Sequence, residues 1–318
     1  MRKVSAVVSI VGIVFLCASP LLAKWQRVIH EDGSGWQVSV EPIEHWTSAE
    51  GAESPKWQPV RVGTPASYPE SVEPADQYRW PFIWSQEPVE AKKAVYFRRT
   101  IHLDALVQSA RVQVCAYGTE LVVYLNGEKL IETGEMGALH TIDLTERLKP
   151  GPNIIAAAVV RGEKNFGLLV MGEAEVQWPM LQYSRVAVGH QMPPMESELW
   201  KPCEEGLALE WEGTSYPTIQ PEGGMAEYST AHFMMPLTTG EYLPFAAALR
   251  IAGDDSYEVK VNGKVAAVQK CASRSYMPVT VDISDYLSAG GHNIITARVT
   301  NDWGPGRIHL LPSAILLF

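Results

Sequence analysis

Glu120-Leu-Val-Val-Tyr-Leu-Asn-Gly-Glu-Lys129 and Ser256-Tyr-Glu-Val-Lys-Val-Asn-Gly-Lys-Val265 follow one pattern. In both, a strand-like run with alternating apolar residues leads into an Asn-Gly step, at Asn126-Gly127 and at Asn262-Gly263. Asn-Gly between strand-like runs indicates a type I′ hairpin, because that turn needs positive φ at both central residues. The sequence therefore predicts a tight β-hairpin in each half of the chain.

A second shared block follows each hairpin. The first is Ile142-Asp-Leu-Thr-Glu-Arg-Leu-Lys-Pro-Gly-Pro-Asn-Ile-Ile155, and the second is Val281-Asp-Ile-Ser-Asp-Tyr-Leu-Ser-Ala-Gly-Gly-His-Asn-Ile-Ile295. Each block begins at a strand end, continues as one helical turn, breaks at glycine and resumes as a β-branched strand. We expect Asp143 and Asp282 to bond the backbone of that turn, and a catalytic role for them is the weaker alternative.

Further matches extend the repeat in both directions. Ala94–Leu103 resembles Tyr228–Leu237 in position and alternation, and Phe166–Val176 closes the first unit as Arg307–Phe318 closes the second. No long segment shows a convincing helical period, and short strands separated by Gly, Pro and Asn turns favour β-sandwiches. The predicted fold class is therefore all-β, with two tandem jelly-roll sandwiches.

The amino terminus has the three parts of a secretory signal peptide. Arg2 and Lys3 precede the apolar run Val4–Leu16, and small residues follow. We expect cleavage after Ala23 and a secreted or periplasmic protein with no membrane span after cleavage, an uncleaved anchor being the alternative. A large residue precedes Cys17, which disfavours a lipid anchor at that cysteine.

The length of the remaining chain favours two domains rather than one core. Gln191–Ser197, with Pro193-Pro194, has the composition of a linker. Leu181–Val188 is either a late strand of the first domain or part of the connection. The predicted division is 1–23 signal peptide, 24–190 first jelly-roll domain with an irregular Trp- and Pro-rich opening, 191–197 linker, and 198–318 second jelly-roll domain.

Charge and cysteine content exclude some classes of protein. The formal net charge is −10, and an acidic chain repels a phosphate backbone, so nucleic acid is not an expected partner. Cys115, Cys203 and Cys271 remain after cleavage, with no CxxC pair, so sulfur ligation of a metal is disfavoured. Cys115 falls in an apolar run and is expected to be buried, and Cys203 with Cys271 is the one pairing that we consider.

Motifs in both halves resemble a known family. Tyr96-Phe97-Arg98-Arg99, Leu125-Asn126-Gly127 and Ile142-Asp143-Leu144-Thr145 resemble the galactose-binding-like sugar-binding domain of family 2 glycoside hydrolases and of bacterial α-L-rhamnosidases. Gly253–Tyr257 and Val261–Gly263 look similar again, so the resemblance covers most of residues 50–176 and 225–318. It implies two tandem galactose-binding-like domains. The family's catalytic machinery lies in a separate barrel domain, for which we find no segment here.

Aromatic residues are the leading candidates for ligand contact, because the C–H faces of sugars stack on aromatic rings. Trp80-Pro-Phe-Ile-Trp84 has loop character, and jelly-roll modules often bind through loops at one end. The alternative is that these rings cover a sheet. Six tryptophans fall in the opening: Trp25, Trp36, Trp46, Trp57, Trp80 and Trp84. The first-domain candidates are Trp80, Trp84, Tyr117, Glu120, Arg161 and Asn165.

The second domain offers a polar loop cluster with one ring. Its candidates are Asp254, Asp255, Asn301, Trp303 and Arg307. Plain turn chemistry and a structural calcium ion at the two adjacent aspartates are the alternatives. No other cofactor is expected.

Three classes of function stay open. A non-catalytic carbohydrate-binding protein leads. A structural or interaction module that binds another extracytoplasmic protein is the second. An enzyme related to glycoside hydrolases or polysaccharide lyases, with a site between the domains, is the third, and it needs two facing carboxylates. Glu173 and Glu175 share a strand face, but solvated acids on an acidic protein are the favoured interpretation, and no nucleophile elbow is present.

Overall fold

The computed structural model describes residues 35–63, 82–134, 137–162, 167–238, 244–270, 277–288, 292–302, 304 and 306–317. The predicted signal peptide, with Cys17, lies outside these residues. Strands dominate, and the helices are single turns such as α2 (Met180–Tyr183), η3 (Ala49–Gly51) and η6 (Ser284–Tyr286). The all-β fold class predicted from the sequence is confirmed.

Sheet A belongs to the first half of the chain. Its order is β2-β1-β5-β10-β7-β8, and all of its paired neighbours run antiparallel. Inward positions of its long central strands, such as Phe97 and Ala157, are completely buried. The bounds are β1 Gln37–Ser39, β2 Gln58–Pro59, β5 Ala94–Leu103, β7 Glu120–Leu125, β8 Glu128–Thr133 and β10 Gly151–Val160.

Sheet C repeats this arrangement in the second half. Its order, β13-β12-β16-β21-β18-β19, matches that of sheet A strand by strand. The register makes Phe97 equivalent to Phe233, because these residues face Ala157 and Ala297. The bounds are β12 Arg185–Val188, β13 Lys201–Pro202, β16 Ser229–Thr238, β18 Ser256–Val261, β19 Lys264–Gln269 and β21 His292–Asn301.

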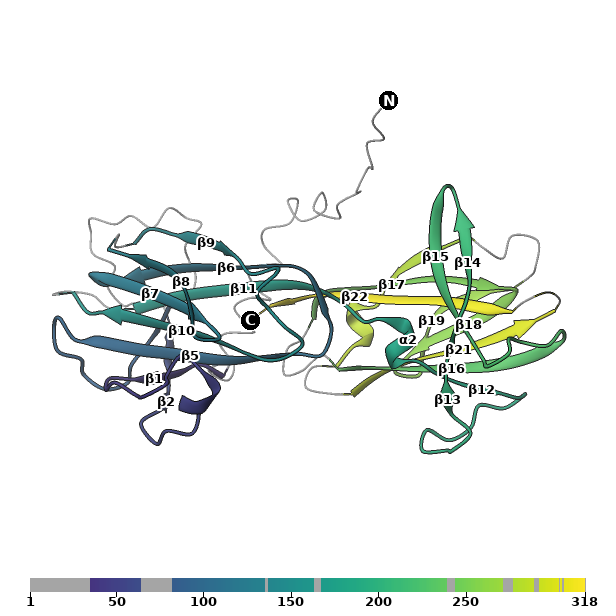
Figure 1. Cartoon of the computed structure of the whole chain (residues 1–318), viewed down its shortest axis with the longest axis horizontal. Coiled ribbons are helices and arrows are strands. Elements are labelled where there is room, and N and C mark those ends of the chain that lie inside the picture. Colours follow the sequence, from purple (N-terminus) through teal and green to yellow (C-terminus); the bar gives the residue numbers. More distant parts are fainter. Residues whose placement is uncertain are drawn as a thin grey trace, which may run out of the picture.

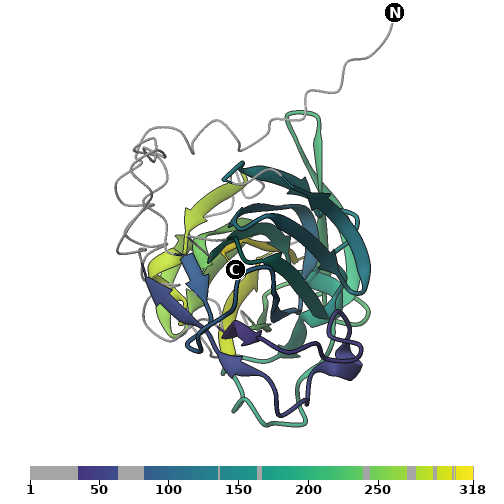
Figure 2. The same cartoon turned by 90° about the vertical axis from the view of Figure 1, so that its left-hand side faces the viewer.

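Sheet B runs the length of the molecule and covers both halves (Figure 1). The first half contributes β3 Arg61–Gly63, β4 Phe82–Trp84, β6 Leu106–Tyr117, β9 His140–Asp143 and β11 Gly167–Gln177. The second half contributes β14 Glu204–Trp211, β15 Thr214–Gln220, β17 Pro244–Asp254, β20 Val279–Asp282 and β22 Arg307–Leu317. Looking along the long axis, Figure 2 shows the first sandwich in front of the second.

The two halves meet where β11 pairs with β22. Glu173–Gln177 lie antiparallel to Ser313–Leu317, with Glu175 opposite Ile315. Ala174 opposes Leu316, and both side chains are buried in one hydrophobic cluster that extends through both sandwiches. Residues directly opposite one another in a ladder share a face. Sheets A and C therefore lie on the same side of sheet B, and buried side chains are continuous across the junction. The division of the chain into two domains stays a prediction.

The strand that the sequence left unassigned lies with the second half. β12 pairs with β16 and with β13, all in sheet C. The predicted linker, Gln191–Ser197, therefore connects two strands that pair with each other. α2 lies between the last strand of the first sandwich and β12.

The predicted hairpin turns are confirmed. Asn126 and Gly127 have φ of 51° and 84°, and Asn262 and Gly263 have φ of 49° and 79°. The Asn126 carboxamide oxygen also accepts a hydrogen bond from the Ile154 amide at 2.8 Å, and Asn262 does the same for Ile294 at 2.9 Å. Each asparagine therefore makes the turn and ties it to the neighbouring strand.

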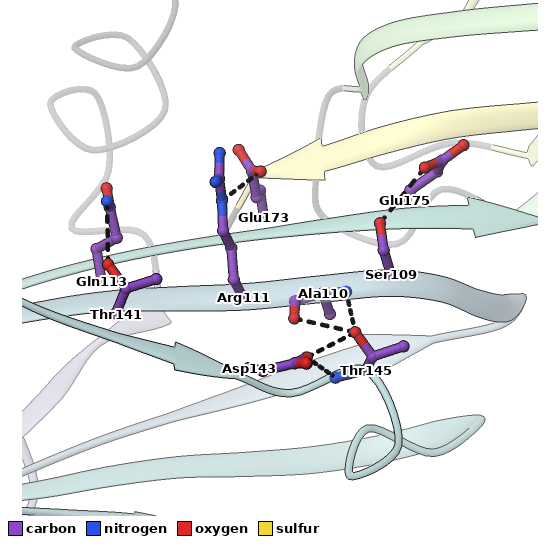
Figure 3. Close-up of polar contacts among 9 residues, drawn as sticks. All are labelled: Ser109, Ala110, Arg111, Gln113, Thr141, Asp143, Thr145, Glu173 and Glu175. Carbon is purple, nitrogen blue, oxygen red and sulfur yellow. Dashed lines mark hydrogen bonds and ion pairs between the residues drawn. The ribbon is translucent and has the colours of Figure 1, made fainter. Parts of the chain in front are cut away.

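Both aspartates of the second shared block bond the backbone as expected. Asp143 accepts hydrogen bonds from the Thr145 amide at 2.9 Å and from its hydroxyl at 2.7 Å (Figure 3). Asp282 accepts the same pair from Ser284, at 2.9 and 2.6 Å. The bonds from Thr145 lower the pKa of Asp143. These contacts fit the structural interpretation of the two aspartates.

Candidate functional site

The described first-domain candidates lie at one end of the first sandwich but do not form one surface. Trp80 and Asn165 lie outside the described residues. Tyr117 is buried, with its ring centroid 5.0 Å from that of Phe82. Glu120 is exposed at the start of β7, opposite Val160, and half-buried Arg161 follows directly. Trp84 is half-buried on β4, and the Arg61 guanidinium lies 5.8 Å from its ring.

The described candidates of the second domain are all buried. The Asn301 carboxamide donates to the carbonyls of Met225, Ala226 and Gly304 at 3.3, 3.1 and 2.8 Å. The Asp255 carboxylate accepts a hydrogen bond from the Asp302 amide at 2.7 Å. These are the contacts of turn chemistry.

Two further second-domain candidates face each other across the sheet. Asp254 on β17 is directly opposite Arg307 on β22, and their exposed fractions are 3% and 8%. Trp303 lies outside the described residues. Within the described ranges, no group of three or more His, Cys, Asp or Glu side chains is arranged to hold a metal. Structural calcium therefore stays an expectation from the sequence.

A different set of rings meets on the outer face of sheet A. Trp46, from the connection between β1 and β2, contacts Tyr96 of β5 and Tyr124 of β7, with centroid distances of 5.1 and 5.3 Å. All three residues are half-buried. We call these three residues the aromatic cluster.

Strand register explains why the cluster forms. Tyr96 is opposite Ala158 of β10, and Tyr124 is opposite Ala156 of the same strand. Small side chains on the strand between the two tyrosines leave room above the sheet for the Trp46 indole. The ring planes cross at 67° and 77°, so the rings meet edge to face and do not stack over one another.

Charged groups border the aromatic cluster. Lys129 of β8 is opposite Tyr124, and its ammonium lies 2.6 Å from the Glu132 carboxylate. That carboxylate raises the pKa of Lys129. On the connection that carries Trp46, His45 lies 3.5 Å from Glu50. Apolar ring faces beside polar hydrogen-bonding groups are the composition that a sugar site needs.

At the described positions of the second sandwich that correspond to Tyr96 and Tyr124, there are no aromatic rings of this kind. The shared strand register puts His232 where the first sandwich has Tyr96, and Lys260 where it has Tyr124. Lys260 is ion-paired with Glu258 at 2.6 Å. The repeat therefore provides, within one molecule, the same framework with and without the rings.

A small hollow at the edge of sheet A is a weaker candidate. Its volume is about 160 Å³, below the roughly 300–1,000 Å³ of typical ligand pockets. Two polar pairs occupy its lining, Lys56 with Glu41 at 2.8 Å and Gln58 with Glu87 at 2.8 Å. The lining residues are Val38, Ser39, Val40, Glu41, Lys56, Gln58, Ser85 and Glu87.

Glu173 and Glu175 lie on the outer face of sheet B, where the sandwiches join (Figure 3). Glu173 forms an ion pair with Arg111 at 2.7 Å, and Glu175 accepts a hydrogen bond from Ser109 at 3.4 Å. Side chains at i and i+2 stand side by side on a strand and do not face across a bond. The contacts fit the interpretation of these residues as solvated surface acids.

The two described thiols are buried and free. Burial raises the pKa of Cys115 to about 11 and that of Cys203 to about 12, so neither is a ready thiolate. Cys271, the partner considered for Cys203 from the sequence, lies outside the described residues.

His309 is a buried titratable group on β22. Its Nδ1 lies 2.6 Å from the Pro217 carbonyl, which can only accept, so Nδ1 carries the proton. Its ring meets Tyr216 edge to face at 5.4 Å, and the Arg250 guanidinium lies 5.6 Å from that tyrosine ring. Burial lowers the pKa of His309, Arg250 lowers it further, and the bond to Pro217 acts in the opposite sense.

This lowered pKa predicts a loss of stability in acid. An unfolded histidine takes up a proton near pH 6.5, before the folded His309 does, so folding stability falls as the pH drops below about 6.5. We expect His309→Gln, which keeps a donor for Pro217, to lose less of its melting temperature between pH 7.5 and 5.5 than the wild type. His292→Gln, at an exposed position, is the control. An unchanged pH dependence in His309→Gln would contradict the assignment.

Comparison with known proteins gives similarity of structure only. No protein-family model matches the chain, and no curated protein matches it either. Among solved structures, a glycosyl hydrolase family 2 member from Bacteroides cellulosilyticus is 12% identical, with a TM-score of 0.30 over 88% of this chain and 30% of that one. Streptomyces avermitilis α-L-rhamnosidase, complexed with L-rhamnose, is 14% identical, with a TM-score of 0.28 over 74% of this chain and 26% of that one.

A lectin from Pleurotus ostreatus, in complex with GalNAc, is 17% identical, with a TM-score of 0.25 over 74% of this chain and 77% of that one. This chain spans less than a third of the two hydrolases. At such low similarity the comparisons carry no argument about function. In the part of the chain that the structure describes, no helix has the length and apolar character of a membrane span.

Proposed function

We propose that this protein is exported by the signal sequence at residues 1–23 and binds carbohydrate, without catalysis, through the aromatic cluster. The observation that carries the proposal is the meeting of three half-exposed rings with charged groups on one face of one sandwich. A sugar ring would stack on the exposed ring surface, and Lys129 and Glu132 would bond its hydroxyls.

The charges around the cluster favour neutral sugars. The cation beside the rings, Lys129, is already neutralised by Glu132, and Arg147, from the connection between β9 and β10, is paired with Glu128 of β8 at 2.7 Å. A uronic acid or sulfated sugar would bring a further negative charge to a region with Glu44 and Glu50. We therefore expect neutral glycans to bind and acidic glycans to bind weakly.

The test is calorimetric titration of the full-length secreted protein with a panel of neutral and acidic oligosaccharides. Tyr124→Ala should weaken binding of a neutral ligand about tenfold, which is about 1.4 kcal/mol. Lys260→Ala, the equivalent change in the second sandwich, should leave affinity unchanged. No detectable binding of any oligosaccharide in the panel, or an equal loss of affinity in the two variants, would refute the proposal.

A protein-interaction role is the second candidate, and one observation favours it. The connection between β12 and β13, together with its flanks, exposes large apolar side chains. They are Val188, Met192, Met195 and Leu199, with exposed fractions of 62%, 50%, 45% and 66%. Exposed apolar side chains gathered on one segment are typical of interaction surfaces. Capture of one stable partner that Leu199→Ser releases would support this role.

A further inference from the structure

The connection that carries Trp46 is tightly folded. The Ser48 amide donates to the His45 carbonyl at 3.0 Å, and the Trp57 indole N–H donates to the Gly51 carbonyl at 2.7 Å. A Cβ at Gly51 would lie 2.5 Å from the His45 carbonyl oxygen, so the turn accepts no larger residue there. The backbone around Trp46 therefore has a defined shape before any ligand arrives.

Arg98 joins this turn to the sheet. It stands on the outer face of β5, two residues after Tyr96, and only 1% of it is exposed. Its Nη1 donates to the Ser48 carbonyl at 3.3 Å, and its guanidinium lies 5.4 Å from the centroid of the Trp57 ring. The arginine thus contacts both the turn beside Trp46 and the tryptophan that closes that turn.

The burial of the Arg98 guanidinium carries a desolvation cost. Nε and Nη2 have no hydrogen-bond partner among the described residues. Its hydrogen bond within the described part of the chain goes to a neutral carbonyl, and a buried guanidinium that has no counter-ion there is unfavourable. An apolar side chain at this buried position would stabilise the fold more than arginine does.

The second sandwich has an apolar residue at the equivalent position. Strand register puts Met234 at the position equivalent to Arg98, opposite Thr296 where Arg98 is opposite Ala156. The second sandwich does keep the tryptophan hydrogen bond, because the Trp200 indole N–H donates to the Pro194 carbonyl at 2.9 Å. In both sandwiches the tryptophan donates to the carbonyl of the residue six positions earlier. Only the sandwich with the aromatic cluster adds the arginine.

We propose that Arg98 is a positioning residue that fixes Trp46 over Tyr96 and Tyr124 by clamping the Ser48–Gly51 turn to β5. The consequence for ligand affinity rests on the proposed function. The consequence for the conformation of Trp46 does not.

The test uses the full-length protein labelled with 5-fluorotryptophan, with the Trp46 fluorine signal assigned from Trp46→Phe. In Arg98→Met, which installs the residue of the second sandwich, we expect the Trp46 signal to shift or broaden. The signals of Trp178 and Trp211 should stay in place, and the melting temperature should stay within a few degrees of the wild type. Affinity for a neutral glycan should fall at least tenfold.

The outcomes separate the two proposals. An unchanged Trp46 signal in Arg98→Met overturns the positioning role, whatever the glycan data show. A displaced Trp46 signal in a protein whose wild type binds no glycan supports the positioning role and refutes the proposed function. If Arg98→Met fails to fold, Arg98→Lys decides, because lysine keeps the charge but lacks the fork that reaches Ser48. A displaced Trp46 signal at an unchanged melting temperature then supports the role, and an undisturbed signal overturns it.

Discussion

Trp46→Ala is expected to reduce affinity for a neutral glycan about 50-fold, which is about 2.3 kcal/mol. The indole contacts both tyrosines, so its removal takes away one ring and also the packing that orients the other two. Trp46 is half-buried on a surface connection, so the fold should survive the change. Titration calorimetry measures the affinity, and far-ultraviolet circular dichroism checks the fold.

Trp46→Phe is the matched control for this change. It keeps an aromatic face of smaller area, so its loss of affinity should lie between the wild type and Trp46→Ala. An alanine variant that binds as tightly as the wild type would show that the glycan is recognised elsewhere on the molecule.

Leu316→Ala should destabilise both sandwiches at once, by about 3 kcal/mol. Leu316 is 3% exposed, lies on the inner face of sheet B, and belongs to the hydrophobic cluster that both sandwiches share. A loss of this size should lower the melting temperature by about 6–10 °C. Scanning calorimetry should show one transition, shifted as a whole.

Ser313→Ala is the control on the same strand. Ser313 pairs with Gln177 and is half-buried, so its hydroxyl contributes little to the shared core and the transition should hardly move. Two separate transitions in Leu316→Ala, with only one displaced, would contradict a common core and indicate two independently folding halves.

The local structure followed from the sequence because its signals are local. Asn126-Gly127 and Asn262-Gly263 form tight turns since few other pairs tolerate positive φ at both positions. Asp143 and Asp282 bond groups two residues away, so neighbouring residues were enough to predict their role. The match of Ala94–Leu103 to the second half was two residues out of step, because the strand register equates Ala94 with Thr230. A two-residue shift in the alignment of the two halves keeps inward positions matched to inward positions, so the alternation of apolar residues does not reveal it.

The junction could not be predicted, because it depends on a pairing between residues far apart in sequence. Glu173–Gln177 and Ser313–Leu317 each look like the end of an ordinary strand, and neither segment indicates that the other completes its edge. The same limit explains why β12, next in sequence to the first sandwich, was not assigned to sheet C.

The aromatic cluster was missed for a related reason. Trp46 was one of several tryptophans in an irregular opening, and the loop character of Trp80-Pro-Phe-Ile-Trp84 favoured Trp80 and Trp84 over it. The available signal was that Tyr96 and Tyr124 both occupy outward positions, on the two strands that flank Ala156 and Ala158 of β10. That the two tyrosines share one face of the sheet can be recognised only when the strand order is known.

The antiparallel ladder between β11 and β22 also has a consequence for how the chain is made. Translation produces Glu173–Gln177 long before Ser313–Leu317. One edge of β11 therefore stays unpaired while the ribosome synthesises the second sandwich. During that interval the nascent first half presents a bare strand edge with buried-type residues such as Ala174 and Val176 beside it. Synthesis of β22 closes this edge, so the nascent protein is exposed to intermolecular strand pairing until β22 has been made.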